Sequence, residues 1–335
     1  MSAWVYFVRR VSLLPLILLG LFTVIFLLTH VIPADPARAM AGEGAGEEQI
    51  LKIQEKFHLN EPLYRQYIMY LGGLLEGDLG TSIHTWRPVS ADLQDYFPAT
   101  LELTSVSMVF AVLIGVLFGT LSAVYKDTLL DGVITVFSVS GLSMPRFWLG
   151  IVLLITVCLL LDVFPLGGRI NPNIKLNEVT GLYILDSVLT GNWAALKSTL
   201  WHICLPAFTL AVTSLGLFSR ITRTTLLDRL REDYVRTARA IGNPERTVIW
   251  HALRNALIPI VTVMGMQFAF LLGGTVVVET VFDWPGLGLY ASKAALTSDY
   301  PAITGVTLLF GVVRMLFNLM VDVSYFFLNP KIRQS

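Results

Sequence analysis

The sequence predicts an all-α integral membrane protein with six transmembrane helices, and three observations lead to that prediction. Only 14% of the 335 residues are charged, 54% are hydrophobic and the mean hydropathy is +0.67, whereas soluble domains are about 25% charged. Uncharged runs long enough to cross a bilayer recur along the chain. Lys and Arg gather in alternate connecting segments, as they do in multi-pass membrane proteins.

Six stretches are predicted to span the membrane, because a helix rises about 1.5 Å per residue and the hydrocarbon core is about 30 Å thick. Five rest on uncharged length, namely residues 11–31, 103–125, 147–161 with the apolar lead-in 132–145, 198–219, and 255–278. The sixth, 302–328, is long enough but contains Arg314 and Asp322. The first run is longer than the apolar core of a signal peptide, about 7–15 residues, and lacks a small-x-small cleavage site, so we expect a retained helix.

The distribution of charge predicts the orientation of these helices. With the N-terminus inside, the inside segments carry a net charge of +7 and the outside segments −8, although the whole chain is neutral. The positive-inside rule therefore places both termini in the cytoplasm. The same asymmetry accounts for the basic residues without a nucleic-acid partner.

The chain divides into three parts. Residues 1–98 are predicted to form the first membrane helix and a small extracytoplasmic helical subdomain, with apolar residues at helical spacing in 47–59 and 62–74. Residues 99–328 form a five-helix core that contains a cytoplasmic loop at 220–258, and 329–335 is a cytoplasmic tail. A second outside segment, 162–197, is predicted to be a loop with one short surface helix near 182–189.

The loop between the fourth and fifth spans is the most informative polar segment. Residues 228–241 are rich in Arg and Ala and predict a helix, which Gly242, Asn243 and Pro244 stop. A second helix restarts at Glu245 and enters the membrane near Pro259. Such a hairpin is either a docking surface for another protein or a positive anchor that only sets topology, and from the residues alone both interpretations remain open.

The chain shows no pattern typical of a metal site or a nucleotide site. Its five histidines have no i, i+4 pairing, and both Cys158 and Cys204 lie in apolar runs without zinc-ligand spacing. No glycine-rich segment carries the Lys and Ser or Thr of a phosphate-binding loop. We therefore expect no metal, no cofactor and no ATP in this chain. A membrane hydrolase and an ion-coupled secondary transporter remain as alternatives.

Several segments of the chain resemble those of a known family. EDYVRTARAIGNPERTVIWHALRNALIP, at 232–259, resembles the cytoplasmic coupling loop of type I ABC importer permeases of the dipeptide, oligopeptide and nickel group. Ala238 and Gly242 match the broad importer motif, whereas Arg236 and Thr237 replace its usual Glu and first Ala. The resemblance continues over nearly the whole chain through HVIPADP, GDLGTS, ATLELT, SMPRFW, TGNW, FDWPGLG, SDYP, NLMVDVSY and NPKIR.

The resemblance implies a permease subunit of the bacterial inner membrane that carries dipeptides or short peptides by alternating access. Oligopeptides, nickel chelates, glutathione and opines are alternative cargoes in that group. The implied partners are a second homologous permease, an extracytoplasmic substrate-binding protein and two ATPase subunits, which would hold ATP and Mg. The residues expected to contact an ATPase subunit are Tyr234, Arg236, Ala238, Arg239, Ala240, Gly242, Asn243 and Pro244.

Polar residues within or next to the spans are candidates for the pore or its gate. They are Ser140, Ser143, Arg146, Gln267, Glu279 and Asp283, although Ser also serves helix packing. Arg146 follows a predicted helix break at Pro145, where it would meet a peptide carboxylate or a lipid headgroup. Arg314, Asn318 and Asp322 form one stripe at a spacing of four residues, and we favour a structural network over a substrate-facing role.

Overall fold

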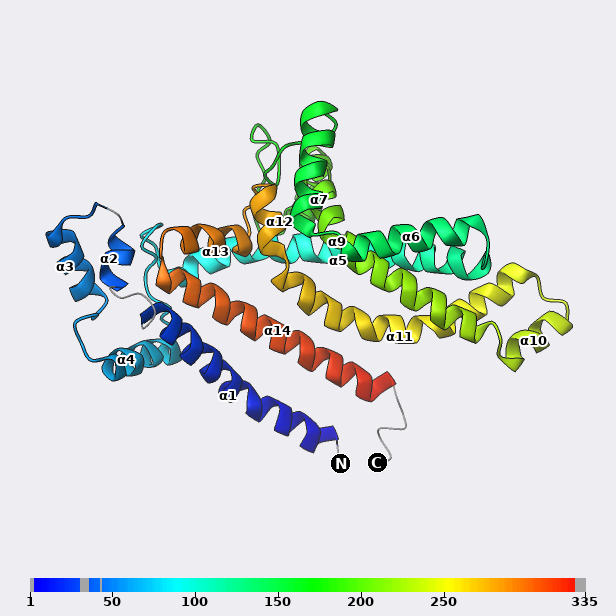
Figure 1. Cartoon of the computed structure of the whole chain (residues 1–335), viewed down its shortest axis with the longest axis horizontal. Helices are drawn as coiled ribbons and strands as arrows, with labels where there is room; N and C mark the ends of the chain where they lie inside the picture. Colours follow the sequence, from blue (N-terminus) through cyan, green and yellow to red (C-terminus); the bar gives the residue numbers. More distant parts are fainter. Residues whose placement is uncertain (1–2, 31–35, 43, 329–335) are drawn as a thin grey trace. The chain divides into compact units, whose positions relative to one another are not determined.

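A computed structural model describes residues 3–30, 36–42 and 44–328 of the chain (Figure 1). Most of these residues are helical, and one isolated bridge, between Thr81 and Pro88, is their only extended pairing. The predicted all-α class is therefore confirmed. The tail at 329–335 and the segment at 31–35 lie outside the described residues, as does most of HVIPADP.

Among the described residues, four helices are long and apolar enough to cross a membrane. They are Ser12–His30, Val89–Val124, Trp193–Arg229 and Tyr300–Met320. Two bent pairs meet the same test together: Leu129–Ser143 with Arg146–Leu160, bent by 107°, and Glu245–Leu257 with Pro259–Gly273, bent by 46°. Counting each bent pair as one span gives up to six crossings by length and composition.

The chain divides into two compact units, which we describe separately. The first comprises residues 1–100 and 285–316, so the stretch 285–316 returns to the N-terminal unit. Its helices are α1 (Ala3–His30), α2 (Pro36–Ala41), α3 (Glu47–Lys56), α4 (Leu63–Glu76), α13 (Leu287–Leu296), the start of α5 (Val89–Val124) and most of α14 (Tyr300–Leu328). The helices predicted at 47–59 and 62–74 are thus confirmed, while α13 was not predicted.

Apolar contacts hold the first unit together. The buried side chains of Phe22 and Ile25 on α1 and Leu308 on α14 form a cluster, against which α4 packs Tyr67, Tyr70, Leu71 and Leu74. Of the apolar residues in the predicted helix at 62–74, these four lie on its packed face, whereas Leu63 and Ile68 are exposed. A second cluster joins α5, α13 and α14 through Val89, Leu287, Tyr290 and Val306.

The second unit comprises residues 101–284 and 317–335. It contains the rest of α5, then α6 (Leu129–Ser143), α7 (Arg146–Leu153), the π-helix η1 (Leu154–Leu160), α8 (Tyr183–Leu189), α9 (Trp193–Arg229), α10 (Asp233–Ala240), α11 (Glu245–Gly273), α12 (Thr275–Val281) and the end of α14. The helix break predicted near Pro145 is confirmed, since Met144 and Pro145 are extended between α6 and α7.

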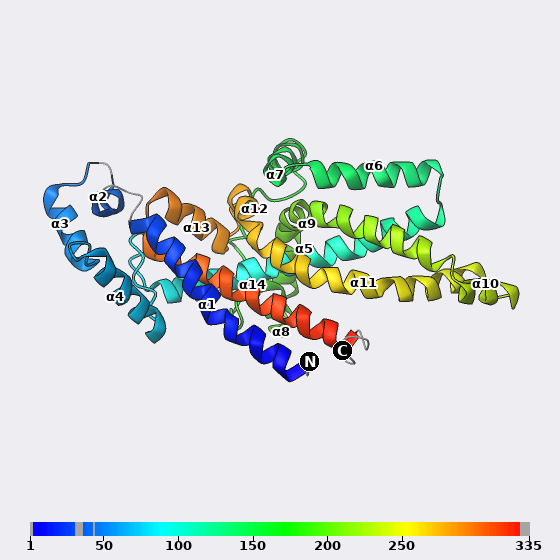
Figure 2. The same ribbon diagram turned by 60° about the horizontal axis from the view of Figure 1, so that its bottom comes forward.

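Within this unit, α9 runs beside both α6 and α11, as both views show (Figures 1 and 2). Small residues permit the close approach of these helices. A Cβ on Gly216 of α9 would lie 2.4 Å from the carbonyl oxygen of Ser138 on α6, and one on Gly119 of α5 would lie 2.5 Å from that of Ser219. Small residues at such crossings are typical of packing between membrane helices.

The cytoplasmic loop differs from the prediction at one point. We predicted a continuous helix over 228–241, but α9 continues to Arg229 and α10 begins only at Asp233. Glu232 has extended backbone angles, φ −72° and ψ 154°, and its carboxylate accepts a hydrogen bond from Arg229. This local ion pair accompanies a sharp turn at a place where helix propensity alone favours continuity.

Candidate functional site

The loop between α9 and α11 is a helical hairpin with α10 at its tip (Figures 1 and 2). The C-terminal end of α10 is closed by two backbone hydrogen bonds. Gly242 N–H donates to the Arg239 carbonyl at 3.0 Å, and Asn243 N–H donates to the Ala238 carbonyl at 3.2 Å. This pair of bonds is a Schellman cap, whose central residue must adopt left-handed angles. Gly242 does so with a φ of +84°.

Apolar packing fixes α10 against the two long helices. Val235 is 1% exposed and clusters with Leu226 of α9 and with Val248, Ala252 and Ala256 of α11. Ala238 packs against the same cluster. Ala238 nevertheless remains partly exposed, and its contact with a partner stays a prediction.

The opposite face of α10 is open. Seven of the predicted contact residues are exposed, namely Tyr234, Arg236, Arg239, Ala240, Gly242, Asn243 and Pro244. Two large apolar side chains that the prediction missed lie in the same hairpin, Ile241 with 73% and Trp250 with 59% of its surface exposed. Aromatic and apolar side chains on a charged surface are typical of protein contacts. The exposure of Ile241 depends on where α10 ends, which helical periodicity does not define to the residue.

Exposed polar contacts align the tip of the hairpin. Arg239 donates to both carboxylate oxygens of Glu245, at 3.1 Å from Nε and 2.6 Å from Nη2. Asn255 Nδ2 donates to the hydroxyl of Tyr234 at 3.2 Å. Because these groups are open to solvent, their contribution to stability is small. They hold an exposed surface in one shape.

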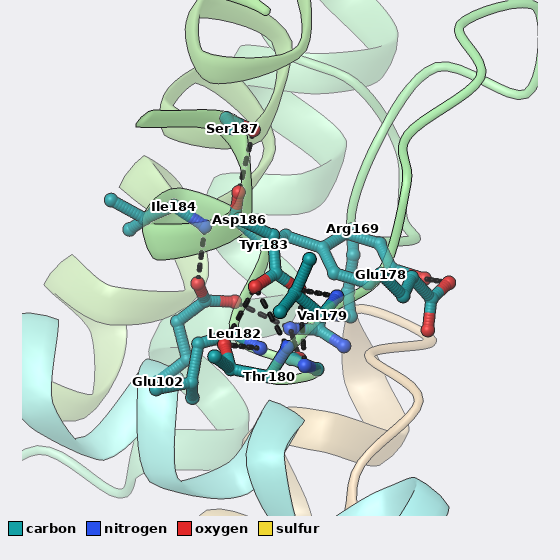
Figure 3. Close-up of polar contacts among 11 residues, drawn as sticks. Glu102, Arg169, Glu178, Val179, Thr180, Leu182, Tyr183, Ile184, Asp186 and Ser187 are labelled. Atoms are coloured by element: carbon teal, nitrogen blue, oxygen red, sulfur yellow. Dashed lines mark hydrogen bonds and ion pairs between the residues drawn. The ribbon is translucent and has the colours of Figure 1, made fainter. Parts of the chain in front are cut away.

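A second polar cluster lies at the other end of the second unit and joins α5 to the segment before α9 (Figure 3). Arg169 Nη2 donates to Glu102 Oε2 at 2.6 Å and to the carbonyl of Gly181 at 2.8 Å. The other oxygen of Glu102 accepts the N–H of Ile184 at 2.7 Å. Both charged side chains are buried, and the guanidinium carbon lies 3.6 Å from the ring centroid of Tyr183. We call these residues, with Asp186, the outer cluster.

Asp186 organises the turn that precedes α8. Its carboxylate accepts the N–H groups of Val179, Thr180 and Gly181 and the hydroxyl of Thr180, at 2.7–3.2 Å. Burial raises the pKa of Asp186, but these hydrogen bonds outweigh it and the net pKa lies below its ordinary value. Burial, followed by the hydrogen bond to Glu178, raises the pKa of Tyr183 to about 12. The short helix predicted near 182–189 is therefore confirmed as α8. It is not free on the surface, because the hydrogen bond between Ile184 and Glu102 connects it to α5.

The first unit brings together segments that are far apart in the sequence. Asp299 of SDYP accepts hydrogen bonds from the hydroxyl of Ser82 in GDLGTS at 2.6 Å and from the N–H groups of Ile83 and His84. Leu287 N–H, in FDWPGLG, donates to the hydroxyl of Thr100, in ATLELT, at 2.8 Å. These polar residues are structural, since their side chains are used within the chain.

A third polar contact joins α6 to α9. Asp131 accepts two hydrogen bonds from Arg223, at 2.9 Å from Nε and 2.8 Å from Nη2, and another from the hydroxyl of Ser122 on α5. Asp131 is buried and Arg223 is partly buried. Closer to the C-terminal end of α6, the hydroxyl of Ser138 donates to that of Ser219 on α9 at 3.1 Å. This part of α6 is therefore used for packing.

The pore candidates have different surroundings. Ser140, Ser143 and Asp283 are exposed, and Ser143 hydrogen-bonds its own helix. Gln267 donates to the hydroxyl of Ser214 at 2.8 Å. Glu279 requires a correction, because it is fully buried in α12 rather than placed at an open mouth. Trp284 is also fully buried.

The remaining candidates lie on α14. Arg314 and Asn318 are exposed, and the side chain of Asp322 lies outside the described residues, so the polar network stays a prediction. Within the described part of the chain, no group of three or more His, Cys, Asp or Glu side chains is arranged to hold a metal ion.

Sequence comparisons agree with the resemblance. Residues 115–334 match the family described as binding-protein-dependent transport system inner membrane component, and residues 4–104 match the N-terminal family of the same components. A probable D,D-dipeptide transport system permease protein of Escherichia coli K12 is 40% identical over 99% of this chain and 98% of the relative. A dipeptide transport system permease protein of Alkalihalophilus pseudofirmus is 38% identical over 98% and 99%. A glutathione transport system permease protein of Salmonella choleraesuis is 39% identical over 97% of each chain.

Proposed function

We propose, from the premise that this chain belongs to the family of inner-membrane components of binding-protein-dependent transport systems, that it is the permease subunit of an ATP-driven dipeptide importer. It forms half of a pathway through the membrane and carries its cargo by alternating access. Relatives named for dipeptides and D,D-dipeptides, at 37–40% identity over nearly the full length, support this cargo. Glutathione is the second candidate, since a glutathione permease is 39% identical.

The observation that carries the proposal is the open face of the hairpin. Val235 and the Gly242 cap hold α10 in one orientation, while Tyr234, Arg236, Arg239 and Ile241 are exposed to solvent. An ATPase subunit would bind this face. Closure of two ATPase subunits around ATP would then draw the hairpins of two permeases together, because ATP binds the closed state better.

The proposal also includes a topology and a set of partners. The four long helices and two bent pairs would make six crossings, with both termini in the cytoplasm and residues 31–88 outside. A second homologous permease, two ATPase subunits that bind ATP and Mg, and an extracytoplasmic binding protein would complete the transporter. This chain would catalyse no reaction itself.

Reconstitution of the complete transporter in proteoliposomes tests the function. With the binding protein saturated by Ala-Ala, we expect uptake that requires ATP. Gly242→Asp, which forces a side chain into left-handed angles, and Arg239→Glu, which places two acids side by side, should each abolish the stimulation of ATP hydrolysis by the loaded binding protein. Lys175→Glu makes the same kind of charge change at an exposed position away from the hairpin and should leave stimulation intact.

Two results would overturn the proposal. Uptake driven by an ion gradient without ATP would indicate a secondary transporter. Intact stimulation and uptake in both hairpin variants would show that the hairpin only sets topology.

A further inference from the structure

Three arginines of the second unit are withdrawn from solvent, and one of them differs from the other two. Arg169 is paired with Glu102, and Arg223 is paired with Asp131. Arg146 is half-buried and has no carboxylate partner among the residues that the structure describes. Its Nε donates to the hydroxyl of Thr213 at 3.4 Å, which is a weak contact.

Arg146 lies at the break within a candidate membrane span. It is the first residue of α7 in the bent pair Leu129–Ser143 and Arg146–Leu160, whose two helices are bent by 107° and are together apolar enough to cross a membrane. An unpaired cation within the hydrocarbon core is costly, and such residues face protein or a water-filled cavity.

Neighbouring residues hold the guanidinium in place. Its carbon lies 5.1 Å from the ring centroid of Phe270 on α11. It also lies against Gly274, where a Cβ would come within 1.9 Å of Nη1. Any side chain at Gly274 would displace the arginine. The close approach and the aromatic contact fix the position of a charge that nothing in the described chain neutralises.

The break between α6 and α7 adds a second feature that favours an anion. The first N–H groups of a helix have no acceptor within the helix, and its N-terminal end carries a partial positive charge. No side chain caps the N-terminus of α7. Interrupted membrane helices in transporters use such ends to receive anionic groups of the substrate. Arg146 is both the arginine without a carboxylate partner and the first residue of α7.

We propose that Arg146, with the N-terminal end of α7, binds the terminal carboxylate of the peptide as it passes through the membrane. The inference rests on the proposed function. Dipeptides, D,D-dipeptides and glutathione, for which the relatives are named, all have a free carboxylate. Phe147 and Trp148 follow on the first turn of α7 and are both exposed, so apolar surface is available beside the charge for peptide side chains.

The test compares Ala-Ala with its C-terminal amide in the reconstituted transporter. The binding protein is saturated with each peptide in turn, so that its own preference does not limit uptake. Loss of a charged hydrogen-bond partner costs roughly tenfold or more in binding. We therefore expect the unaltered transporter to take up Ala-Ala about tenfold faster than the amide. Arg146→Gln should abolish this discrimination by slowing Ala-Ala alone, and Arg146→Lys should retain part of it.

Controls separate this role from others. Arg314→Gln removes an exposed arginine from a different candidate membrane helix and should leave the ratio of the two uptake rates unchanged. Equal slowing of both peptides by Arg146→Gln would overturn the inference and indicate an acidic partner in the second permease. An unchanged ratio in Arg146→Gln would overturn it as well. Absence of Ala-Ala uptake by the unaltered transporter would instead overturn the proposed function and, with it, this inference.

Discussion

The hairpin around α10 and the outer cluster around Arg169 are both rich in charge, but they use charge in opposite ways. Arg239 and Glu245 are 45% and 56% exposed, whereas Arg169 and Glu102 are 6% and 4% exposed. The hairpin is held by apolar contacts and a glycine cap, and its charges remain open to a partner. The outer cluster is held by the ion pair of Arg169 and Glu102 and by the hydrogen bonds of their side chains. The hairpin, for which we propose a protein partner, and the outer cluster therefore differ in what holds them together.

The largest effect is expected at the outer cluster. Arg169→Met would leave Glu102 buried with only the Ile184 N–H as partner, which should cost about 3–5 kcal/mol of unfolding free energy. Hydrogen exchange over residues 179–189 of the purified transporter measures the loss. The double variant Glu102→Gln, Arg169→Met removes both charges and should recover most of it. Equal losses in the single and double variants would contradict a role for the ion pair.

The next effect concerns Asp186. Asp186→Asn weakens hydrogen bonds to a charged acceptor and should cost about 1.5–3 kcal/mol. Because the folded-state pKa is lowered, the stabilisation is present above the unfolded-state pKa and is lost as the pH falls through the folded-state pKa. The protection factors at 179–189, in which exchange is corrected for its intrinsic pH dependence, should accordingly fall on acidification in the unaltered protein and change little in Asp186→Asn. The same pH response in both proteins would assign it to another group.

A smaller effect is expected at Gly242. Gly242→Ala meets no neighbouring atom, so its cost is that of left-handed angles for an L-residue, about 1–2 kcal/mol. Limited proteolysis at 240–245 should become faster. Gly132→Ala, on α6, also meets no neighbouring atom and lies in a helix with ordinary angles, so it should be neutral or slightly stabilising. Equal effects of the two substitutions would argue against the cap.

The smallest effect on stability is expected for Arg239→Gln. The ion pair with Glu245 is exposed, so solvent screening limits its contribution to less than about 1 kcal/mol. Its effect on the ATPase activity of the assembled transporter should be much larger than its effect on thermal unfolding. A loss of unfolding free energy above about 2 kcal/mol would show that this pair is structural, like that of the outer cluster.

The hairpin and the outer cluster also differ in how far they could be predicted from the sequence. Membrane spans follow from apolar length, and the end of α10 follows from Gly242 because a cap is a local property. The pair of Glu102 and Arg169 is separated by 67 residues, and nothing in the local sequence of either residue identifies the other. Helix α13 was missed because Pro285 and the neighbouring glycines obscure its apolar spacing. Ile241 was missed because its exposure depends on the last turn of α10.

The account rests on the open face of α10, and cysteine labelling tests it most directly. Ile241 and Val179 are exposed to similar extents, 73% and 68%, one on the hairpin and one beside the outer cluster. With Cys158 and Cys204 replaced by Ala, Ile241→Cys and Val179→Cys are labelled with a maleimide, with and without bound ATPase subunits. We predict that the ATPase subunits protect position 241 and leave position 179 unchanged. Equal labelling of Ile241→Cys in the two states would contradict the account.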